Sequence, residues 1–427
     1  MQSRTTAGFL YPFGVCFGFA AARRANEAAM TAAPDLPNAP VPMREIFWYF
    51  LRLGWLAFGG PVGQIGLMHL DVVERRRWLS EEEFVRALNF CHVLPGPEAL
   101  QLAIYIGYKR RGYLAGALAG VLFILPGYLT LAGLAWVYVH FGKTPQVLGV
   151  LWGFRPVGLA LLLAALVRIS RAALKGPLPV ALALAAFAAF YFAHLPFVLV
   201  LLGCGVLYLG SRQIGRFGGA AALLAMPVLS RADEAAARLA DISWFFLKVG
   251  LFSFGGAYAV LPYIRDGAVA QYGWISDAQM IDALALGETT PGPLISIGIF
   301  VGFLAGNGAA APWLGASAAT FWLFLPSFVF VLGTARYMEW LTTRPGIKEF
   351  LKGVTSGVVG LMFSIAIPLA KVAFMPQGAL DVWTLALGLA AFALLTFWKW
   401  RLNVVAVVLA GGALGLLRAF APGLFGA

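Results

Sequence analysis

The sequence predicts an all-α polytopic membrane protein with two inverted-topology repeats of about six membrane segments each. Each repeat holds one helix broken by a Pro-Gly-Pro triplet, which forms a re-entrant loop or a hairpin of two short spans. Of the 427 residues, 61% are hydrophobic and 12% are charged, whereas a soluble protein carries about 25% charged residues. The apolar runs approach the ~20 residues that a helical span needs. Several motifs also recur at one fixed spacing.

The first 43 residues differ from the rest of the chain. The apolar run 8–22 is short for a span, and a Pro/Ala-rich stretch without Lys or Arg follows Arg23 and Arg24. We interpret residues 1–43 as a disordered leader. Alternatively, they result from an upstream start codon, with Met30 or Met43 as the true start.

Two sets of six apolar segments follow this leader. The first repeat, residues 44–211, contains segments at about 44–68, 84–108, 112–139, 147–167, 178–192 and 195–211. Residues 212–240 form a basic linker. The second repeat, residues 241–420, contains segments at about 241–264, 280–305, 313–335, 350–370, 380–397 and 402–418.

The two sets are internal repeats. Three motifs of the first set return 196 residues later: Phe-Gly-Gly at 58–60 and 254–256, Trp-x-Ser at 78–80 and 274–276, and Pro-Gly-Pro at 95–97 and 291–293. A Leu-Pro pair recurs at 125 and 325 after a short insertion. Self-similarity at a fixed spacing is the signature of a duplicated unit.

Loop charge predicts that the repeats are inverted. The first two loops of the first repeat carry the clusters 75–77 and 109–111, whereas their counterparts in the second repeat are poor in Lys and Arg. The third loop reverses this pattern, with Lys143 alone in the first repeat and four basic residues in the second. Because basic loops stay in the cytoplasm, corresponding loops lie on opposite sides. The linker is then cytoplasmic and the C-terminus outside.

The helix breaks are the predicted substrate site. Proline removes a backbone donor and clashes with the preceding turn, and broken helices at matching positions in two repeats indicate a transporter binding site. Half-helix N-termini attract anions, and glycine pairs let a backbone approach a ligand. Close packing by small residues is the alternative role. The candidates are Gly59, Gly60, Pro95, Gly96, Pro97, Gly255, Gly256, Pro291, Gly292 and Pro293.

Charged residues inside the apolar segments are costly and therefore functional candidates. Arg52 and Lys248 occupy equivalent positions and would suit an anionic substrate, or they snorkel to the interface. Arg155 is a further cation, on the anion path or at the interface.

Three titratable residues flank the Pro-Gly-Pro triplets. His92 and Glu98 flank the first triplet, and Glu288 precedes the second at the position equivalent to His92. They can couple transport to a proton or another ion. Their alternative role is to bond carbonyls freed by the breaks.

Several function classes are not supported. The cysteines Cys16, Cys91 and Cys204 lie far apart, so we expect no disulfide and no metal site. No HExxH, GxSxG or Walker motif occurs, so we expect neither an enzyme nor a cofactor. The net charge of +12 is distributed over short loops, which indicates topology and not nucleic-acid binding.

The motifs resemble those of the chromate transporter (CHR) family. FGGPVGQIGLMH followed by WLSEEEFVRALNFCHVLPGPEALQLAIYIGYKRRGYLAG carries the resemblance in the first repeat. FGGAYAVLPYI and WISDAQMIDALALGETTPGPLISIGIFVGFLAG carry it in the second. The resemblance covers about residues 44–420 and is to the long, two-domain members. The second repeat departs at Ser327, where the first has Gly127.

The resemblance implies an exporter of chromate in a bacterial inner membrane that confers chromate resistance and is coupled to ion or proton gradients. A sulfate or other oxyanion permease is the first alternative, because these tetrahedral dianions are nearly isosteric, and an anion channel is the second. The expected partners are the oxyanion and the lipid bilayer. A second copy of the chain, in a homodimer, is a further possible partner.

Overall fold

A computed structural model describes residues 41–58, 60–212, 234–254, 256–376, 378–397 and 403–421. Within these ranges the chain is helical and forms no strand, as the all-α prediction required. We call residues 44–211 the first half and 241–420 the second half. The sequence predictions for residues 1–40, Gly59 and Gly255 concern positions outside the described residues.

The first half forms eight α-helices and the π-helix η2. They are α2 (Met43–Leu56), α3 (Gly60–His69), η2 (Leu70–Arg75), α4 (Glu81–Cys91), α5 (Glu98–Arg111), α6 (Tyr113–Phe141), α7 (Pro145–Ala173), α8 (Pro177–Tyr191) and α9 (Phe197–Arg212). The predicted segment 44–68 is therefore two helices. Gly60, the second glycine of its Gly-Gly pair, begins the second of these helices.

The second half follows the same order. It contains α10 (Glu234–Leu251), η3 (Ala257–Val260), α11 (Leu261–Arg265), η4 (Asp266–Gln271), α12 (Asp277–Thr289), η5 (Leu294–Ser296), α13 (Ile297–Asn307), α14 (Pro312–Thr334), η6 (Ala335–Tyr337), α15 (Met338–Thr343), α16 (Pro345–Phe374), α17 (Val382–Phe397) and α18 (Asn403–Phe420). Helix α10 begins inside the segment 212–240 that the sequence predicted to be a linker.

Four helices are long and apolar enough to cross a membrane. They are α6, α7, the segment Pro312–Tyr337 that contains α14, and α16. Shorter apolar helices accompany them, at Pro177–Tyr191, Phe197–Ser211, Leu294–Asn307, Val382–Phe397 and Val404–Phe420. The fold is that of a multi-pass helical membrane protein.

Small features recur between the halves at the spacing of 196 residues. Ser80 and Ser276 each begin a helix with a capping box, in which a serine hydroxyl and a side chain three residues later satisfy free amides. The π-helix η2 has its counterpart in η4. The pair His69–Glu81, at 2.6 Å, is matched by Arg265–Asp277, at 2.8 Å. Equivalent sequences therefore fold into equivalent local structures.

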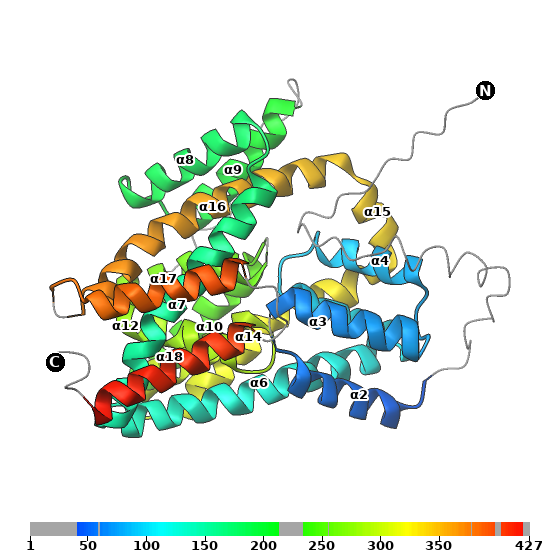
Figure 1. Cartoon of the computed structure of the whole chain (residues 1–427). Helices are drawn as coiled ribbons and strands as arrows, with labels where there is room; N and C mark the ends of the chain where they lie inside the picture. The colour runs from blue at the N-terminus through cyan, green and yellow to red at the C-terminus, as the bar shows by residue number, and fades with distance from the viewer. Residues whose placement is uncertain are drawn as a thin grey trace.

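The halves also exchange packing partners. Helix α2 packs on α6 as α10 packs on α14. The long helix α7 packs against α17 and α18 of the second half, and its counterpart α16 packs against α8 and α9 of the first (Figure 1). Each half therefore completes the other.

The equivalent helices α6 and α14 pack directly against each other and run antiparallel. A Cβ added at Gly116 would meet Leu332, and one added at Gly120 would meet the ring of Phe328. Farther along α6, the hydroxyls of Tyr128 and Ser317 lie 2.8 Å apart. The residue numbers rise along one helix while they fall along the other, so the chains run in opposite directions.

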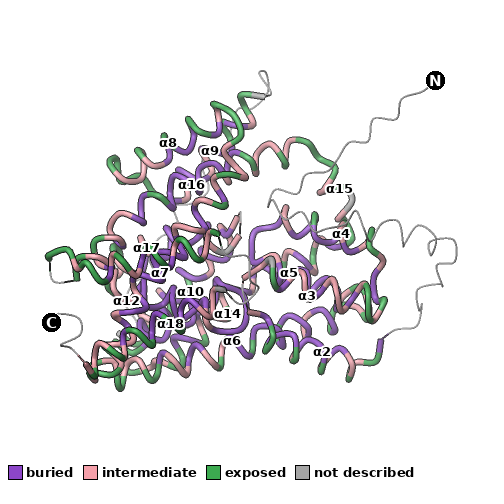
Figure 2. The backbone as a smooth tube through the Cα atoms, in the orientation of Figure 1, coloured by how far each residue is buried: buried purple, intermediate pink, exposed green. Residues whose placement is uncertain are grey.

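Burial separates an interior from a surface that is itself apolar. Buried residues follow α7, α10, α12 and α14 through the middle of the molecule (Figure 2). The outer face of α6 exposes Leu114, Val121 and Leu129, and that of α8 exposes Leu184. Exposed leucine and valine along long helices are suited to contact with lipid.

Candidate functional site

The two Pro-Gly-Pro triplets lie in short loops between helices. The first loop joins the end of α4 at Cys91 to the start of α5 at Glu98, and the second joins α12 to η5. Proline cannot continue a helix because it lacks the backbone donor. Gly96 and Gly292 adopt φ of 131° and 105°, where a residue with a Cβ is strained. The sequence Pro-Gly-Pro therefore specifies both loops.

Each loop pairs with the helix break of the other half. The Gly96 amide donates to the carbonyl of Ser253 at 2.8 Å, and the Gly292 amide donates to the carbonyl of Ala57 at 3.0 Å. Ser253 and Ala57 are themselves equivalent, and each stands just before a Phe-Gly-Gly motif. The structure thus brings together the four breaks that the sequence singled out, in crossed pairs.

The prolines inside α6 and α14 place a small residue against each loop. A Cβ added at Gly96 would collide with the Ser327 hydroxyl, which follows Pro326. On the other side, a Cβ added at Gly127 would lie 2.7 Å from the Pro291 carbonyl oxygen. The departure from Leu-Pro-Gly to Leu-Pro-Ser therefore gives one loop a hydroxyl neighbour and the other a bare backbone.

Two buried glutamines hold the loops from the first half. The Gln64 amide nitrogen donates to the carbonyls of Ala57, at 3.0 Å, and Gly292, at 2.6 Å. The Gln101 amide nitrogen donates to the Pro95 carbonyl at 2.7 Å. Both residues have apolar counterparts, Val260 and Ile297. The two loops are therefore supported differently.

Polar atoms without partners gather around the same loops. Among the described residues, the amide oxygens of Gln64 and Gln101 and the hydroxyls of Ser253 and Ser296 are buried and make no hydrogen bond. A buried polar atom without a partner costs about 1–3 kcal/mol, and such atoms in a native structure call for an explanation. We call these four residues, together with the buried Ser327 beside Gly96, the central polar cluster.

Sequence reasoning missed this cluster. Its signal was present, since Gln64 and Gln101 are uncharged polar residues within apolar runs, a few residues after the Phe-Gly-Gly and Pro-Gly-Pro motifs. The serines carried no such signal, because serine is common at helix interfaces in membranes. Their importance depends on the contacts between halves, which no local pattern reveals.

The predicted titratable residues form two different pairs. His92, at the end of α4, lies 3.0 Å from Glu98, at the start of α5, so this pair spans the first loop. Glu288, near the end of α12, accepts a hydrogen bond from the Tyr258 hydroxyl of η3. That second pair joins the two breaks of the second half. Equivalent positions 92 and 288 therefore bind different partners.

Two of the predicted cations, Arg52 and Lys248, have surroundings other than the central polar cluster. No hydrogen bond or ion pair among the described residues joins Arg52 or Lys248 to it. Arg52 is exposed and lines a cavity beside α2. Lys248 is half-buried, and its ammonium lies 5.5 Å from the centre of the Trp244 ring.

Arg155 forms a buried ion pair that the sequence did not anticipate. Its guanidinium donates to both carboxylate oxygens of Asp282, at 3.0 and 3.2 Å. The Tyr138 hydroxyl donates to the same carboxylate at 3.0 Å. Asp282 has 0% of its surface exposed. The group connects α6 and α7 of the first half with α12 of the second.

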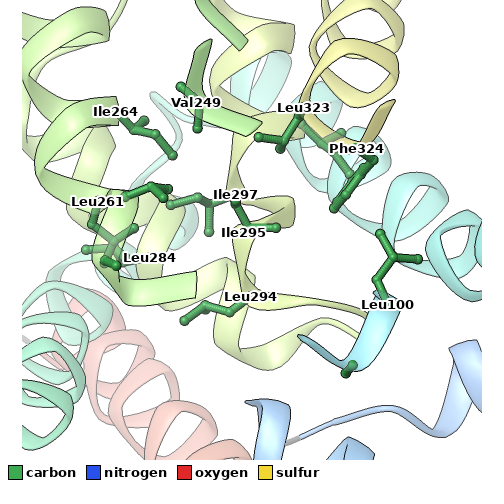
Figure 3. Close-up of a cluster of buried hydrophobic side chains, with 14 of the residues drawn as sticks. Leu100, Val249, Leu261, Ile264, Leu284, Leu294, Ile295, Ile297, Leu323 and Phe324 are labelled. Carbon is green, nitrogen blue, oxygen red and sulfur yellow. The ribbon is translucent and has the colours of Figure 1, made fainter. Parts of the chain in front are cut away.

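Apolar side chains surround the start of the half-helix that follows the second loop. Leu294, Ile295 and Ile297 pack among Val249, Leu261, Ile264 and Leu284 of their own half (Figure 3). Leu100 of the first half belongs to the same cluster. This shell fixes the half-helix and lowers the local dielectric, which strengthens polar interactions at the loops.

The described residues contain no group of three His, Cys, Asp or Glu side chains that could hold a metal ion. Cys91 and Cys204 are free and buried. Crossed helix breaks inside an apolar bundle are typical of membrane transporters, because non-helical backbone at membrane depth must be enclosed by protein or line a cavity.

The chain belongs to the chromate transporter family. The family model matches residues 44–209 and 240–416, one match in each half. The repeated motifs indicated a two-domain chain, and the family model accordingly matches twice.

Curated relatives match almost end to end. A chromate transport protein of Pseudomonas aeruginosa is 34% identical over 92% of this chain and 96% of its own length. A chromate transport protein of Cupriavidus metallidurans is 31% identical over 91% and 96%. A probable chromate transport protein of Synechococcus elongatus is 31% identical over 84% and 90%. No solved structure matches the chain.

Proposed function

We propose that this protein is a secondary transporter that exports chromate across a bacterial inner membrane and so confers chromate resistance. The observation that carries the proposal is the crossed pairing of Gly96 with Ser253 and of Gly292 with Ala57. It places two half-helix N-termini beside a buried cluster of unpartnered polar atoms. The names of the relatives supply the substrate.

The oxyanion binds between the loops in this proposal. The hydroxyls of Ser253 and Ser296 have free protons to donate, and hydrogen bonds to a charged acceptor contribute about 1.5–3 kcal/mol each. The first backbone amides of α5 have no hydrogen-bond acceptor within their own helix. Both loops together provide donors for a tetrahedral dianion.

The direction of transport follows from the membrane potential. Moving one charge through 100 mV is worth about 2.3 kcal/mol. A dianion that leaves a negative interior therefore gains about 4.6 kcal/mol, which corresponds to a gradient of over a thousandfold. Export needs no ATP.

The antiparallel packing of α6 and α14 supports the inverted repeat. Both are long enough to span the membrane, and their contacts run in opposite directions. Equivalent spans that cross in opposite directions belong to halves of opposite topology. Rocking of such halves about a fixed central site gives alternating access.

We assign ion coupling to the two pairs beside the loops. His92–Glu98 spans one loop, and Tyr258–Glu288 joins two breaks. A proton gained or lost at either pair changes the charge next to the substrate, and so couples the two binding events.

The test is accumulation of labelled chromate by everted membrane vesicles, whose outer face is the cytoplasmic one. We expect uptake that rises with an interior-positive potential and is competed by excess chromate. Stronger competition by sulfate than by chromate would favour the permease instead. Absence of uptake in vesicles that contain the protein would overturn the proposal.

A further inference from the structure

A charged cavity of about 240 Å³ lies beside the end of α2, outside the central polar cluster. Its walls come from α2, α3 and the π-helix η2, together with the residue that follows η2. They contain three arginines and one carboxylate among apolar side chains: Tyr49, Arg52, Leu53, Leu56, Leu67, Asp71, Arg75 and Arg76.

The arginines are fixed to different degrees. Arg76 is 2.6 Å from Glu45 and stacks 4.8 Å from the centre of the Tyr49 ring. Arg75 pairs with Asp71 at 3.0 Å, although 65% of its side chain is exposed. Among the described residues, Arg52 makes no ion pair. The lining therefore carries an excess of positive charge, part of it not neutralised.

The equivalent positions of the second half contain fewer charged residues. The counterparts of Arg52, Asp71, Arg75 and Arg76 are Lys248, Gly267, Gln271 and Tyr272. The Phe245 ring lies against Gly267, where a Cβ would collide with it, and it also packs on Tyr272, with ring centres 5.8 Å apart. Aromatic rings occupy the position where the first half has charges.

We propose that the arginine-lined cavity is the loading site, where the oxyanion first binds on the side of residues 75–77. It rests on the proposed function, because the ligand is the transported dianion. Arginine donors fit the oxygens of a tetrahedral dianion, and a cavity of one charge sign concentrates ligands of the other. Its wall residue Leu56 precedes Ala57, whose carbonyl accepts from Gly292.

The asymmetry makes binding depend on the side of approach. The aromatic-filled counterpart offers one lysine, itself next to Trp244, and so binds the anion weakly. A dianion is therefore captured on the arginine side and released from the other. If the loop 75–77 is cytoplasmic, as its charge predicts, this device favours capture from the cytoplasm.

The test compares two single arginine replacements in one loop. Arg75→Gln introduces the residue of the second half into the cavity lining. The matched control, Arg77→Gly, also introduces the residue of the second half, removes one charge outside the lining, and suits the φ of 53° at position 77. Chromate uptake by everted vesicles is measured for both, with wild type as the baseline.

We expect Arg75→Gln to raise KM for chromate about tenfold, as for the loss of one charge-assisted hydrogen bond, with kcat unchanged. Arg77→Gly should keep the KM of wild type, and added KCl should raise KM less in Arg75→Gln than in wild type. Equal KM values for the two variants would overturn the loading site. Wild-type vesicles without uptake would instead refute the proposed function.

A bound lipid phosphate is the competing occupant of the cavity. Two measurements separate chromate from lipid: thermal unfolding in a maltoside detergent without added phosphate or phospholipid, and an assay of the phospholipid that copurifies with each variant. Chromate should raise the Tm of wild type and of Arg77→Gly more than that of Arg75→Gln. The same increase in all three, with phospholipid retained only by wild type and Arg77→Gly, would assign the cavity to lipid and overturn the proposal.

Discussion

At the scale of single residues, we expect Ser253 and Ser296 to bind the substrate through their hydroxyls. Their hydroxyls are buried and unpartnered in the described structure, so removing them costs no hydrogen bond within the protein. Ser253→Ala and Ser296→Ala should each raise KM for chromate about tenfold or more, which matches 1.5–3 kcal/mol for a hydrogen bond to a charged acceptor. The thermal stability of the ligand-free protein should not fall.

The matched control is Ser364→Ala. Ser364 is buried in α16, and its hydroxyl donates to the Leu361 carbonyl of its own helix. Its replacement should leave KM unchanged. If Ser253→Ala and Ser296→Ala behave like this control in uptake assays, the hydroxyls do not contact the substrate.

Asp282 gives a stability prediction. Its carboxylate is fully buried and accepts three hydrogen bonds from Arg155 and Tyr138. Asp282→Asn leaves the Arg155 guanidinium without its counter-ion, and breaking a buried pair costs about 3–5 kcal/mol. Because Arg155 is 23% exposed, we expect the lower end of this range and a lower Tm in detergent. An unchanged Tm would contradict a role of this pair in joining the halves.

Local sequence patterns identify some residues of the candidate site and not others. Pro95, Gly96, Pro291 and Gly292 were found because the triplet violates the chemistry of a helix, and that violation is visible locally. The partners of the loops, Ser253 and Ala57, lie in the other half, so no local pattern identifies them. Arg155 was noticed as a costly cation, but Asp282 was not, although it is equally costly inside an apolar segment.

At the scale of elements, the loops themselves can be converted into helix. Pro95→Ala or Pro291→Ala restores a backbone donor and removes the clash with the preceding turn. Helix propensity favours the change by about 3 kcal/mol per proline. We expect an unchanged or raised Tm in detergent, together with loss of stabilisation by chromate, because the free amides at the start of the half-helix become engaged in intrahelical bonds. Full stabilisation by chromate in both variants would remove the loops from the site.

His69 and Glu81 lie on either side of η2 and outside the candidate membrane spans. Their pairing predicts how stability depends on pH. The pKa of His69 is raised, mainly by its hydrogen bond to Glu81, and burial opposes this only in part. This pair therefore stabilises the fold fully below the ordinary histidine pKa of about 6.5, and its contribution is lost as the pH rises through the raised pKa. An exposed pair contributes about 0.2–1 kcal/mol.

His69→Arg places the charge type of Arg265 at the equivalent position. This variant should lose that part of the decline in Tm between neutral and alkaline pH. Thermal unfolding in detergent across this range is the measurement. Parallel Tm curves for wild type and His69→Arg would show that the pair does not titrate in the folded protein.

The elements were predictable where periodicity and breaks determine them. Segments 112–139, 147–167, 178–192 and 195–211 correspond to α6, α7, α8 and α9 within two residues, except that α7 continues six residues farther, to Ala173. Segment 44–68 divides into α2 and α3 beside Gly60, which belongs to a glycine pair of the kind that can open a helix. The start of α10 was missed because residues 234–240 resemble a charged linker.

At the scale of the whole molecule, the inverted repeat predicts topology. A reporter fused at Arg231 should lie in the cytoplasm, and one fused at Ala427 should lie outside. The physical reason is parity, because inverted halves each need an odd number of crossings. Reporters on the same side would contradict the inversion and leave the antiparallel contacts of α6 and α14 without a topological meaning.

The arrangement of the halves could not be predicted from the sequence. Motif spacing and loop charge predict duplication and inversion, but the exchange of partners by α7 and α16 depends on surfaces that become complementary only in the folded molecule. The same exchange places the loops of one half at the breaks of the other. The candidate site therefore belongs to neither half alone.

The most direct test of this account is chromate counterflow in proteoliposomes containing the purified protein. Unlabelled chromate trapped inside should drive transient accumulation of external labelled chromate above equilibrium with wild type. Accumulation should fall strongly with Ser253→Ala or Ser296→Ala and persist with Ser364→Ala. Equilibration of label without overshoot would indicate a channel, and equal overshoot in all variants would place the substrate elsewhere. Either result would contradict a transporter that carries its oxyanion between two crossed Pro-Gly-Pro loops.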